Sequence, residues 1–263
     1  MQPASVIIIG AGIGGLAAAL RLAHAGCNVT VLEAHGQPGG KMRTIPSPSG
    51  PIDAGPTVLT MRPVFEDLFR AADEDLADHL TLTPLATIAR HYWSDGTQLD
   101  LFADHDASVA AVAEVFGAKA AADLTRFSDR AARLFERFDA PMMQTSAPSQ
   151  TALTLEVLRQ PSIIRDMAPH QSLHRMLRGC FREPKLVQLF GRYATYVGGM
   201  PMAVPALLSL IWQAEATGVW AVAGGMHQLA VRIAALAKER GAQFHYGTSA
   251  TRLVKQGGRV SGV

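Results

Sequence analysis

A glycine-rich segment close to the start of the chain has the spacing of a dinucleotide-binding loop. The residues Gly10-Ala-Gly12-Ile-Gly14-Gly15 match the pattern G-x-G-x-x-G. In this pattern Gly10 permits a tight turn, Gly12 lets the backbone approach a pyrophosphate, and Gly15 allows close packing of a helix on a strand. Gly14 opens the helix, whose N-terminus offers N–H groups and a positive dipole end to the phosphates. The spacing therefore predicts a site for a dinucleotide.

Glu33 supplies the acid that such a site needs. It follows Gly10 by 23 residues, at the end of a second apolar run, where an acidic side chain bonds the ribose hydroxyls. A carboxylate at this place disfavours a 2′-phosphate. FAD or NAD therefore fits the loop better than NADP.

The elements that must position these residues follow from the apolar pattern. Residues 5–9 are a short β-branched run, read as a buried parallel strand, and residues 14–25 predict a helix that Gly26 ends. Residues 28–33 predict the second strand of a βαβ unit. Residues 35–60 are rich in Gly, Pro and Ser, so we expect irregular loops with short extended pieces there.

The rest of the chain is mostly helical before strand character returns. The pattern predicts a helix over 63–72, a hairpin within 80–101 centred on Asp95-Gly96, and helices from 107 to 212 with breaks at 141–148 and Pro161. It then predicts a helix over 226–240, a strand at Phe244 and a strand, turn and strand over 253–263. We therefore expect an α/β domain made of residues 1–60 and 215–263, interrupted by an inserted, mostly helical domain over 61–214.

Composition excludes several classes of protein. Hydrophobic residues make up 48% and charged residues 17% of the 263 residues, which argues against disorder. The net charge of +2 lacks the basic excess of a nucleic-acid binder. Charge is nevertheless uneven: residues 1–114 hold 6 basic and 13 acidic side chains, whereas 115–195 hold 12 and 7. This asymmetry raises the question of an anionic surface, including a membrane.

Neither cysteine nor histidine spacing predicts a metal or disulfide framework. Cys27 and Cys180 stand alone, which favours a cytoplasmic protein. His170 and His174 are one helical turn apart without an evident third ligand. No apolar run reaches the ~18 residues of a membrane span. We expect no metal site and no membrane-spanning segment.

A second glycine pair leads to a family resemblance. Gly39-Gly40-Lys41-Met42-Arg43-Thr44 follows Glu33, and with the first motif it resembles the FAD-dependent amine oxidase and phytoene desaturase superfamily, whose signature continues as G-G-[RK]-x-x-[ST]. Further segments resemble carotenoid desaturases: Asp53-Ala-Gly55-Pro56-Thr57, Arg192-Tyr-Ala-Thr-Tyr196, Gly218-Val219-Trp220 and Gly224-Gly225-Met226. The stretch from Gly55 to Phe65 looks most like the hydroxycarotenoid 3,4-desaturases of phototrophic bacteria.

The resemblance implies FAD as the cofactor and a Rossmann-like FAD-binding domain with a helical substrate domain inserted. It places the second glycine pair, Lys41, Arg43, Gly55, Pro56 and Thr57 along the cofactor, with a basic side chain neutralising the pyrophosphate. Backbone near Ala250, in a strand after Gly247, would touch the adenine. Family members continue with another flavin-contacting segment, so we expect this chain to be truncated at its C-terminus.

The implied reaction is desaturation of an acyclic carotenoid that carries a 1-hydroxy or methoxy group. The substrate implies peripheral attachment to the inner face of a membrane. The sequence marks no catalytic base and no electron acceptor.

One stripe in the middle region has two interpretations. Apolar residues at helical spacing run beside four arginines: Leu124, Phe127, Ala131, Leu134 and Phe138, with Arg126, Arg130, Arg133 and Arg137. The first interpretation is a core-facing stripe with a solvated basic flank. The second is a helix resting on anionic lipid.

Three alternatives to a carotenoid desaturase remain at the level of sequence. A flavin amine oxidase acting on a soluble amine would need an aromatic cage at the flavin. An inactive fragment of such a flavoenzyme would bind no flavin. A plain NAD dehydrogenase would leave Gly39-Gly40-Lys41 and Gly224-Gly225 without a role.

Overall fold

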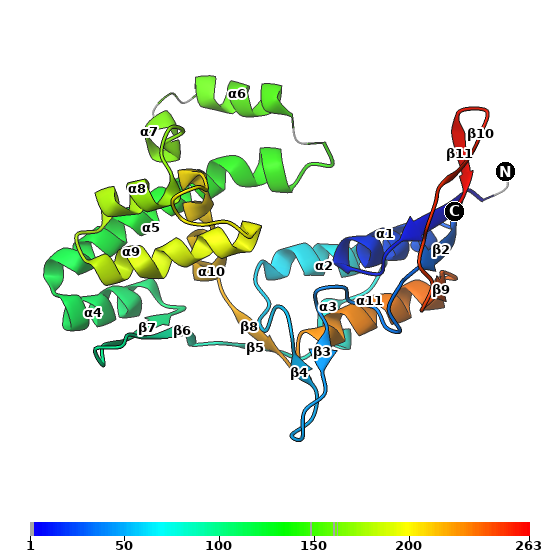
Figure 1. Cartoon of the computed structure of the whole chain (residues 1–263), viewed down its shortest axis with the longest axis horizontal. Helices are drawn as coiled ribbons and strands as arrows, with labels where there is room; N and C mark the ends of the chain where they lie inside the picture. Colours follow the sequence, from blue (N-terminus) through cyan, green and yellow to red (C-terminus); the bar gives the residue numbers. More distant parts are fainter. Residues whose placement is uncertain (1–2, 148, 160, 162) are drawn as a thin grey trace. The chain divides into compact units, whose positions relative to one another are not determined.

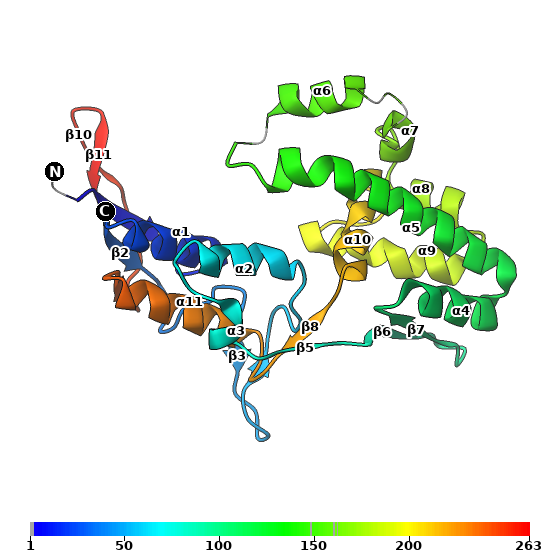
Figure 2. The ribbon, with the colours of Figure 1, turned by 180° about the vertical axis from the view of Figure 1, so that it is seen from behind.

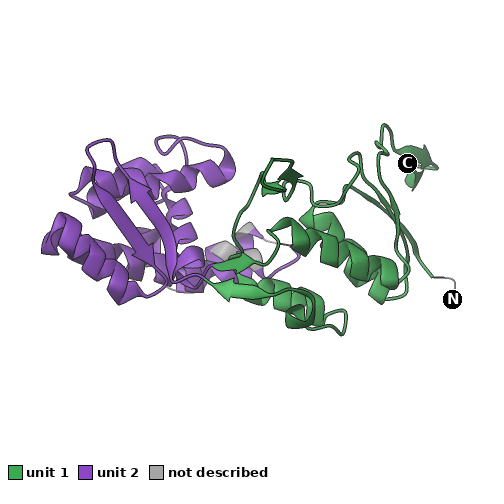
Figure 3. Ribbon diagram, turned by 90° about the horizontal axis from the view of Figure 1, so that it is seen from below, with its two compact units in different colours: residues 1–84, 220–263 green, residues 85–219 purple. Residues whose placement is uncertain are grey.

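The computed structural model describes residues 3–147, 149–159, 161 and 163–263. They form two compact units, the first made of residues 1–84 with 220–263 and the second of residues 85–219 (Figure 3). The insertion therefore begins later than the residue 61 expected from sequence. Leu68 and Phe69 explain the difference, because both are buried in the core of the first unit.

The centre of the first unit is a parallel three-stranded sheet in the order β1-β2-β9. Its strands are β1 (Ser5–Ile9), β2 (Asn28–Leu32) and β9 (Gln243–His245). Helix α1 (Ile13–His24) connects β1 to β2, and α11 (His227–Glu239) precedes β9 and lies beside α1 (Figure 1, Figure 2). The predicted βαβ unit and the predicted helix over 226–240 are confirmed.

Strand β1 is not buried on both faces, so that expectation was wrong. Ile7 is 43% exposed and Ile9 55% exposed, whereas Val29 and Val31 of β2 are buried. The cause is the position of the helices. Both α1 and α11 contribute to the single core on the face that carries Val29 and Val31, and the opposite face carries the two exposed isoleucines.

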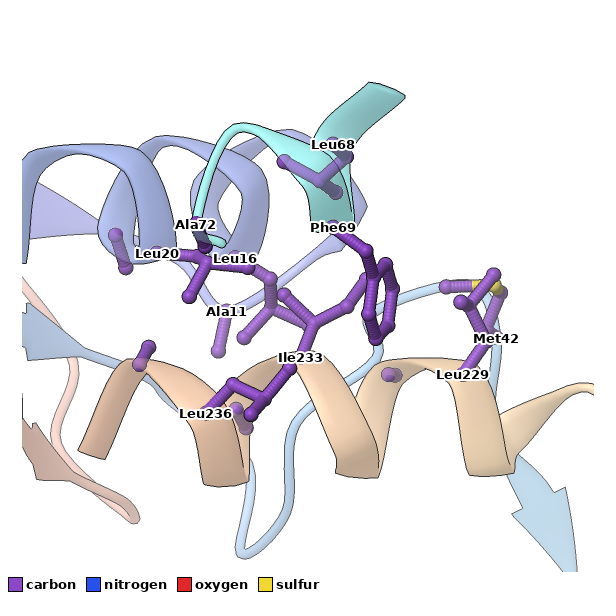
Figure 4. Packing of buried hydrophobic residues seen from close by; sticks show 14 of the residues in the cluster. Ala11, Leu16, Leu20, Met42, Leu68, Phe69, Ala72, Leu229, Ile233 and Leu236 are labelled. Carbon is purple, nitrogen blue, oxygen red and sulfur yellow. The ribbon is translucent and has the colours of Figure 1, made fainter. Parts of the chain in front are cut away.

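The core of the first unit joins its N-terminal and C-terminal segments. Leu16 and Leu20 of α1 meet Leu229 and Ile233 of α11, and Phe69 closes one side (Figure 4). All five side chains are fully excluded from solvent. Residues more than 200 positions apart therefore share one core, which packs α11 against α1.

Short elements complete the first unit. They are β3 (Thr44–Ile45), β4 (Ile52–Asp53), α2 (Arg62–Arg70), α3 (Leu76–His79), β5 (Leu82–Pro84), β8 (Trp220–Val222), β10 (Val254–Gln256) and β11 (Arg259–Gly262). The expected strand, turn and strand over 253–263 is confirmed as the antiparallel pair β10 and β11. The expected hairpin within 80–101 is shorter than predicted, because β5 pairs with β8 instead.

The second unit is a helical assembly with one hairpin. Its elements are β6 (Thr87–Tyr92), β7 (Gln98–Phe102), α4 (His105–Phe116), α5 (Ala118–Phe138), a π-helical turn (Asp139–Met143), α6 (Gln150–Arg159), α7 (Ile163–Met167), α8 (Leu173–Cys180), α9 (Pro184–Gly191), 3-10 turns (Arg192–Val197 and Ala206–Leu210) and α10 (Ile211–Ala216). The Asp95-Gly96 turn joins β6 to β7, as predicted. Pro148, at the end of one expected break, lies outside the described residues.

The apolar stripe on α5 faces the protein interior. Leu124, Ala131 and Leu134 are fully buried and Phe127 is 1% exposed, so the lipid-facing interpretation of this stripe was wrong. Arg130 is also buried rather than solvated, because it donates to Ser209 Oγ at 2.8 Å and to the carbonyl of Asp166. Within the described residues, no helix has the length and apolar character needed to span a bilayer.

Three aromatic rings pack together in the core of the second unit. The ring centroid of Phe127 lies 5.0 Å from that of Phe181 and 4.6 Å from that of Phe190, and all three side chains are buried. Phe127→Ala should lower the free energy of unfolding by about 3–5 kcal/mol, because it removes apolar contacts and leaves a cavity. Urea titration followed by circular dichroism measures the change.

The matched control is Tyr92→Ala, since Tyr92 is an aromatic residue of the same unit that is 69% exposed. We expect it to change stability by no more than about 0.5 kcal/mol. Equal effects of the two substitutions would contradict the assignment of the core.

Candidate functional site

The glycine-rich loop between β1 and α1 is closed by backbone contacts. Gly10 has φ +95° and donates its N–H to the carbonyl of Leu32 at 2.7 Å. A Cβ atom on Gly15 would lie 2.0 Å from the carbonyl oxygen of Gly10. Gly10 therefore needs the left-handed backbone region, and Gly15 allows the close packing that the motif predicted.

The opposite side of the loop is open. A Cβ atom on Gly12 or Gly14 would meet no other atom within 4 Å. Gly12 is the N-cap of α1, and no side chain caps that helix end. The first N–H groups of a helix lack intrahelical partners and attract anions. The open backbone surface at this helix end fits the pyrophosphate of a dinucleotide.

The second glycine pair packs directly on the first motif. Gly39 donates its N–H to the carbonyl of Ala11 at 2.8 Å, and a Cβ atom on Gly40 would lie 3.1 Å from the Cα of Gly12. Gly39 has φ +124°, and a Cβ there would lie 2.2 Å from the carbonyl oxygen of Met42. Residues 10–15 and 39–40, which were selected separately from sequence, therefore form one backbone surface.

Glu33 lies beneath this surface and holds it together. Its side chain is 5% exposed, and its carboxylate accepts hydrogen bonds from the N–H of Ala11 at 2.6 Å and of His35 at 2.8 Å. Each carboxylate oxygen can accept more than one hydrogen bond, so capacity for a ribose hydroxyl remains. The sequence pattern did not predict the bond to Ala11. This bond makes Glu33 a support of the loop as well as a candidate ligand.

The basic residues of the second motif lie at the surface. Lys41 and Arg43 are both exposed. Arg43 lines a cleft of about 420 Å³, whose other lining residues are His35, Gly36, Gln37, Pro38, Gly40 and Thr44. The cleft therefore connects Arg43 with the backbone that follows Glu33, where a cationic side chain can approach an anionic group.

The remaining predicted site residues lie at different distances from the loop. Gly55 packs against the second motif, since a Cβ there would lie 1.9 Å from the carbonyl oxygen of Lys41. Pro56 and Thr57 are exposed, and among the described residues no hydrogen bond joins them to either glycine motif. Ala250 is half-buried in an irregular segment rather than in a strand, which corrects the expectation.

The chain before Ala250 is nevertheless held beside the predicted ribose site. Gly247 donates its N–H to the carbonyl of His35 at 3.0 Å, and Thr248 donates to the carbonyl of Glu33 at 2.8 Å. The strand β9 ends at His245 because the turn at Gly247 follows it. Backbone bonds therefore bring the neighbourhood of Ala250 toward Glu33.

Asp53 is a structural residue of the site whose role sequence reasoning missed. Its carboxylate accepts the N–H of Met226 at 2.8 Å and of His227 at 3.4 Å, at the start of α11. A Cβ atom on Gly225 would lie 2.8 Å from Asp53 Oδ2. The available signal was a helix that starts after Gly224-Gly225 without a capping side chain of its own.

The second unit contains a polar cluster that the sequence did not predict. Glu215 is 7% exposed and accepts hydrogen bonds from Tyr193 Oη at 3.0 Å, Tyr196 Oη at 2.9 Å and Arg192 Nη2 at 2.5 Å. Burial and the charge of Glu215 raise the pKa of Tyr196 to about 12, so its hydroxyl remains a donor at neutral pH. The cluster pairs a buried carboxylate with three donors.

His91 belongs to the same unit and carries a buried Nε2 atom without a hydrogen-bond partner among the described residues. Burial, together with the positive charge of Arg192, lowers its pKa from 6.5 to about 4, while Asp100 opposes the shift. The folded state therefore favours neutral His91.

The first prediction from this geometry is that alanine has different effects on stability at two glycines of the first motif. Gly15→Ala should destabilise the first unit, because the new Cβ would meet the Gly10 carbonyl at 2.0 Å. Gly12→Ala should leave the free energy of unfolding within about 0.5 kcal/mol of the parent, because the space is open and φ is −71°. Thermal unfolding of both variants tests the pair, and equal loss of stability would contradict the open surface.

The second prediction concerns pH. A folded-state pKa of about 4 for His91 means that its neutral form adds stability above pH 6.5, and that this stability is lost as the pH falls from 6.5 toward 4. His91→Gln should remove about 1–2 kcal/mol of this dependence, after allowance for solvent screening. Urea unfolding at several pH values measures it. His170→Gln, at an exposed histidine of the same unit, should leave the dependence intact.

Comparison with known proteins shows the family of this chain. The sequence profile of the family described as flavin containing amine oxidoreductase matches residues 13–262. The chain is 52% identical over 258 residues to the hydroxyneurosporene desaturase of Cereibacter sphaeroides and 47% identical over 258 residues to that of Rhodobacter capsulatus, covering 98% of this chain in both cases. The matched chain covers 52% of each relative's length, which is about half.

A solved structure shows the same fold. Cyclohexylamine oxidase from Brevibacterium oxydans aligns with a TM-score of 0.57 at 22% identity, over 94% of this chain and 51% of that one. At this identity the likeness concerns the fold, an α/β FAD-binding architecture of the amine oxidase type. Since the family profile matches residues 13–262, almost the whole chain, the chain belongs to the flavin-containing amine oxidoreductase family.

Proposed function

We propose that this chain forms part of an FAD-dependent enzyme that desaturates an acyclic carotenoid, one that carries a 1-hydroxy or methoxy group. The observation that carries the proposal is the 52% identity, over 98% of the chain, to a hydroxyneurosporene desaturase. The backbone surface formed by Gly12, Gly39 and Gly40 supports it, because an open helix N-terminus beside glycine fits a pyrophosphate.

Different residues of the first unit bind different parts of FAD. The helix end at Gly12 and Gly14 faces the pyrophosphate, and Lys41 and Arg43 offset its negative charge. Glu33 positions the loop through Ala11 and offers its remaining acceptor capacity to the ribose hydroxyls. Gly55, Pro56, Thr57 and the backbone at Ala250 complete the proposed contacts.

The chemistry requires a hydride acceptor and a dry, extended site. Bound FAD supplies the acceptor for a hydride from an allylic C–H while a proton leaves the neighbouring carbon, so the conjugated system gains one double bond. The protein's task is to align a long apolar chain and to exclude water. We assign FAD binding to the first unit, residues 1–84 and 220–263, and substrate binding to the second unit, residues 85–219.

The substrate also implies a location. A polyene dissolves in the hydrocarbon of a bilayer, so the enzyme must collect it there. We propose peripheral association with the cytoplasmic face of a membrane. The basic excess of residues 115–195 supports this, because anionic lipids attract such segments.

The test is the absorption spectrum of pigments from cells that make an acyclic hydroxycarotenoid, with and without the complete gene product. Added conjugation should shift absorption to longer wavelength. An unchanged spectrum with flavin-loaded protein present would overturn the assigned substrate and favour oxidation of a soluble amine.

A paired substitution links the spectrum to the cofactor site. Gly12→Ala should abolish the absorption shift and weaken FAD binding by at least about tenfold. The added methyl group would crowd the pyrophosphate, and a loss of about 1.4 kcal/mol of binding free energy makes binding tenfold weaker. Gly262→Ala is the control, because that position also has open space but lies in β11. Retention of FAD by the Gly12 variant would contradict the proposed pyrophosphate site.

A further inference from the structure

The second unit contains a cavity that the dinucleotide site does not explain. It measures about 770 Å³ and is lined by residues of α8, of α9 and of the segments beside them. This volume is in the range of small-molecule pockets, which is about 300–1,000 Å³. All of its lining residues lie between 174 and 201, within one compact unit.

Part of the lining is apolar. Phe181 is 3% exposed and Val187 is 8% exposed, and Pro201 completes this side. The ring of Phe181 stacks on Phe190 with centroids 5.1 Å apart, so it is held in place from behind. This rigid apolar surface suits a hydrocarbon chain.

The rest of the lining is cationic. His174, Arg178 and Arg182 follow one another at intervals of four residues, along α8 and the turn after it. Both arginines are exposed, and no salt bridge found among the described residues includes either of them. Residues 171–182 contain no Asp or Glu. These guanidinium groups are therefore available to an external anion.

The nearby carboxylates are already engaged. Asp123 Oδ2 accepts the backbone N–H of Arg182 at 3.3 Å, while its other oxygen accepts from Arg126. Glu183 accepts the N–H of Lys185 at 3.1 Å and caps α9. Neither bond uses the guanidinium of Arg182. The guanidinium group of Arg182 is therefore available to an anion in the cavity.

Exposed apolar side chains adjoin the cavity. Met200 and Met202 flank Pro201 in sequence, and each is 69% exposed. His174 donates its N–H to the Pro201 carbonyl at 2.9 Å, which fixes this segment on the start of α8. Arginines with neighbouring exposed apolar residues are the pattern of a surface that meets a bilayer interface.

We infer that the cavity between α8 and α9 binds an anionic phospholipid at a membrane surface. The phosphate lies against Arg178 and Arg182, one acyl chain packs on Phe181, Val187 and Pro201, and Met200 and Met202 enter the interface. This inference rests on the membrane association proposed above and names the surface and the lipid class. It places the lipid contact elsewhere than on α5, for which lipid contact was one of two interpretations.

Flotation with lipid vesicles tests the inference on the purified chain without any carotenoid. Vesicles of phosphatidylcholine mixed with phosphatidylglycerol should bind the protein, and vesicles of phosphatidylcholine alone should bind it much more weakly. The double variant Arg178→Ala and Arg182→Ala should bind about thirty-fold more weakly, at about 1 kcal/mol per basic residue. Because no turnover is measured, failure of the desaturation proposal would leave this result unaffected.

The matched control removes the same charge elsewhere in the second unit. Arg137→Ala with Arg165→Ala changes two exposed arginines that do not line the cavity, and it should retain vesicle binding. An equal loss in both double variants would show attraction by net charge alone and overturn the inference. Circular dichroism of both variants excludes unfolding as the cause.

Calorimetry with soluble ligands separates lipid from free phosphate. Dihexanoyl phosphatidylglycerol should bind the parent chain more tightly than dihexanoyl phosphatidylcholine or inorganic phosphate. Equal affinity for inorganic phosphate would show an anion site without an acyl pocket. Equal affinity for the choline lipid would show that the arginines are not used. Either result would contradict the inference.

Discussion

The contact between two glycine-rich backbones is the constraint on which the first unit depends. Gly40 lies so close to Gly12 that a Cβ atom would be 3.1 Å from the Gly12 Cα, and Gly39 bonds to Ala11. A side chain at Gly40 would force the two segments apart. The proposed pyrophosphate surface is therefore made of main-chain atoms, and its shape does not depend on side-chain rotamers.

Two buried or half-buried carboxylates connect this surface to distant parts of the chain. Glu33 accepts the N–H of Ala11, and Asp53 accepts the N–H of Met226 at the start of α11. Hydrogen bonds to a charged acceptor contribute about 1.5–3 kcal/mol each, more than bonds between neutral groups. Acidic residues in the first segment thus position the loop and the last helix of the same unit.

The second unit uses its arginines in two ways. Arg130 is buried and donates to Ser209 and to the carbonyl of Asp166, and the half-buried Arg192 pairs with Glu215, so both guanidinium groups bond inside the unit. Arg178 and Arg182 lie at the mouth of a cavity, exposed and without a carboxylate partner among the described residues. Arginines of one unit therefore serve either the interior or a surface, and only the contacts of each side chain distinguish the two.

Local pattern and motif spacing predicted the βαβ unit, α11 and the glycine loop, because each depends on residues close together in sequence. Gly10, Gly12 and Gly15 could be assigned in advance, since strand, turn and helix follow one another there. The Asp95-Gly96 turn was predicted for the same reason.

The errors came from neighbours that are distant in sequence. The apolar stripe of α5 had two interpretations until Leu124 and Leu134 were seen to be buried, because periodicity shows an apolar face but not what covers it. Strand β1 looked buried on both faces, yet its helices cover only one. The sequence by itself determined the local elements and the dinucleotide motif. Only the tertiary structure decided that Asp53 caps α11 and that Glu33 holds Ala11, because those bonds form between segments 22 to 173 residues apart.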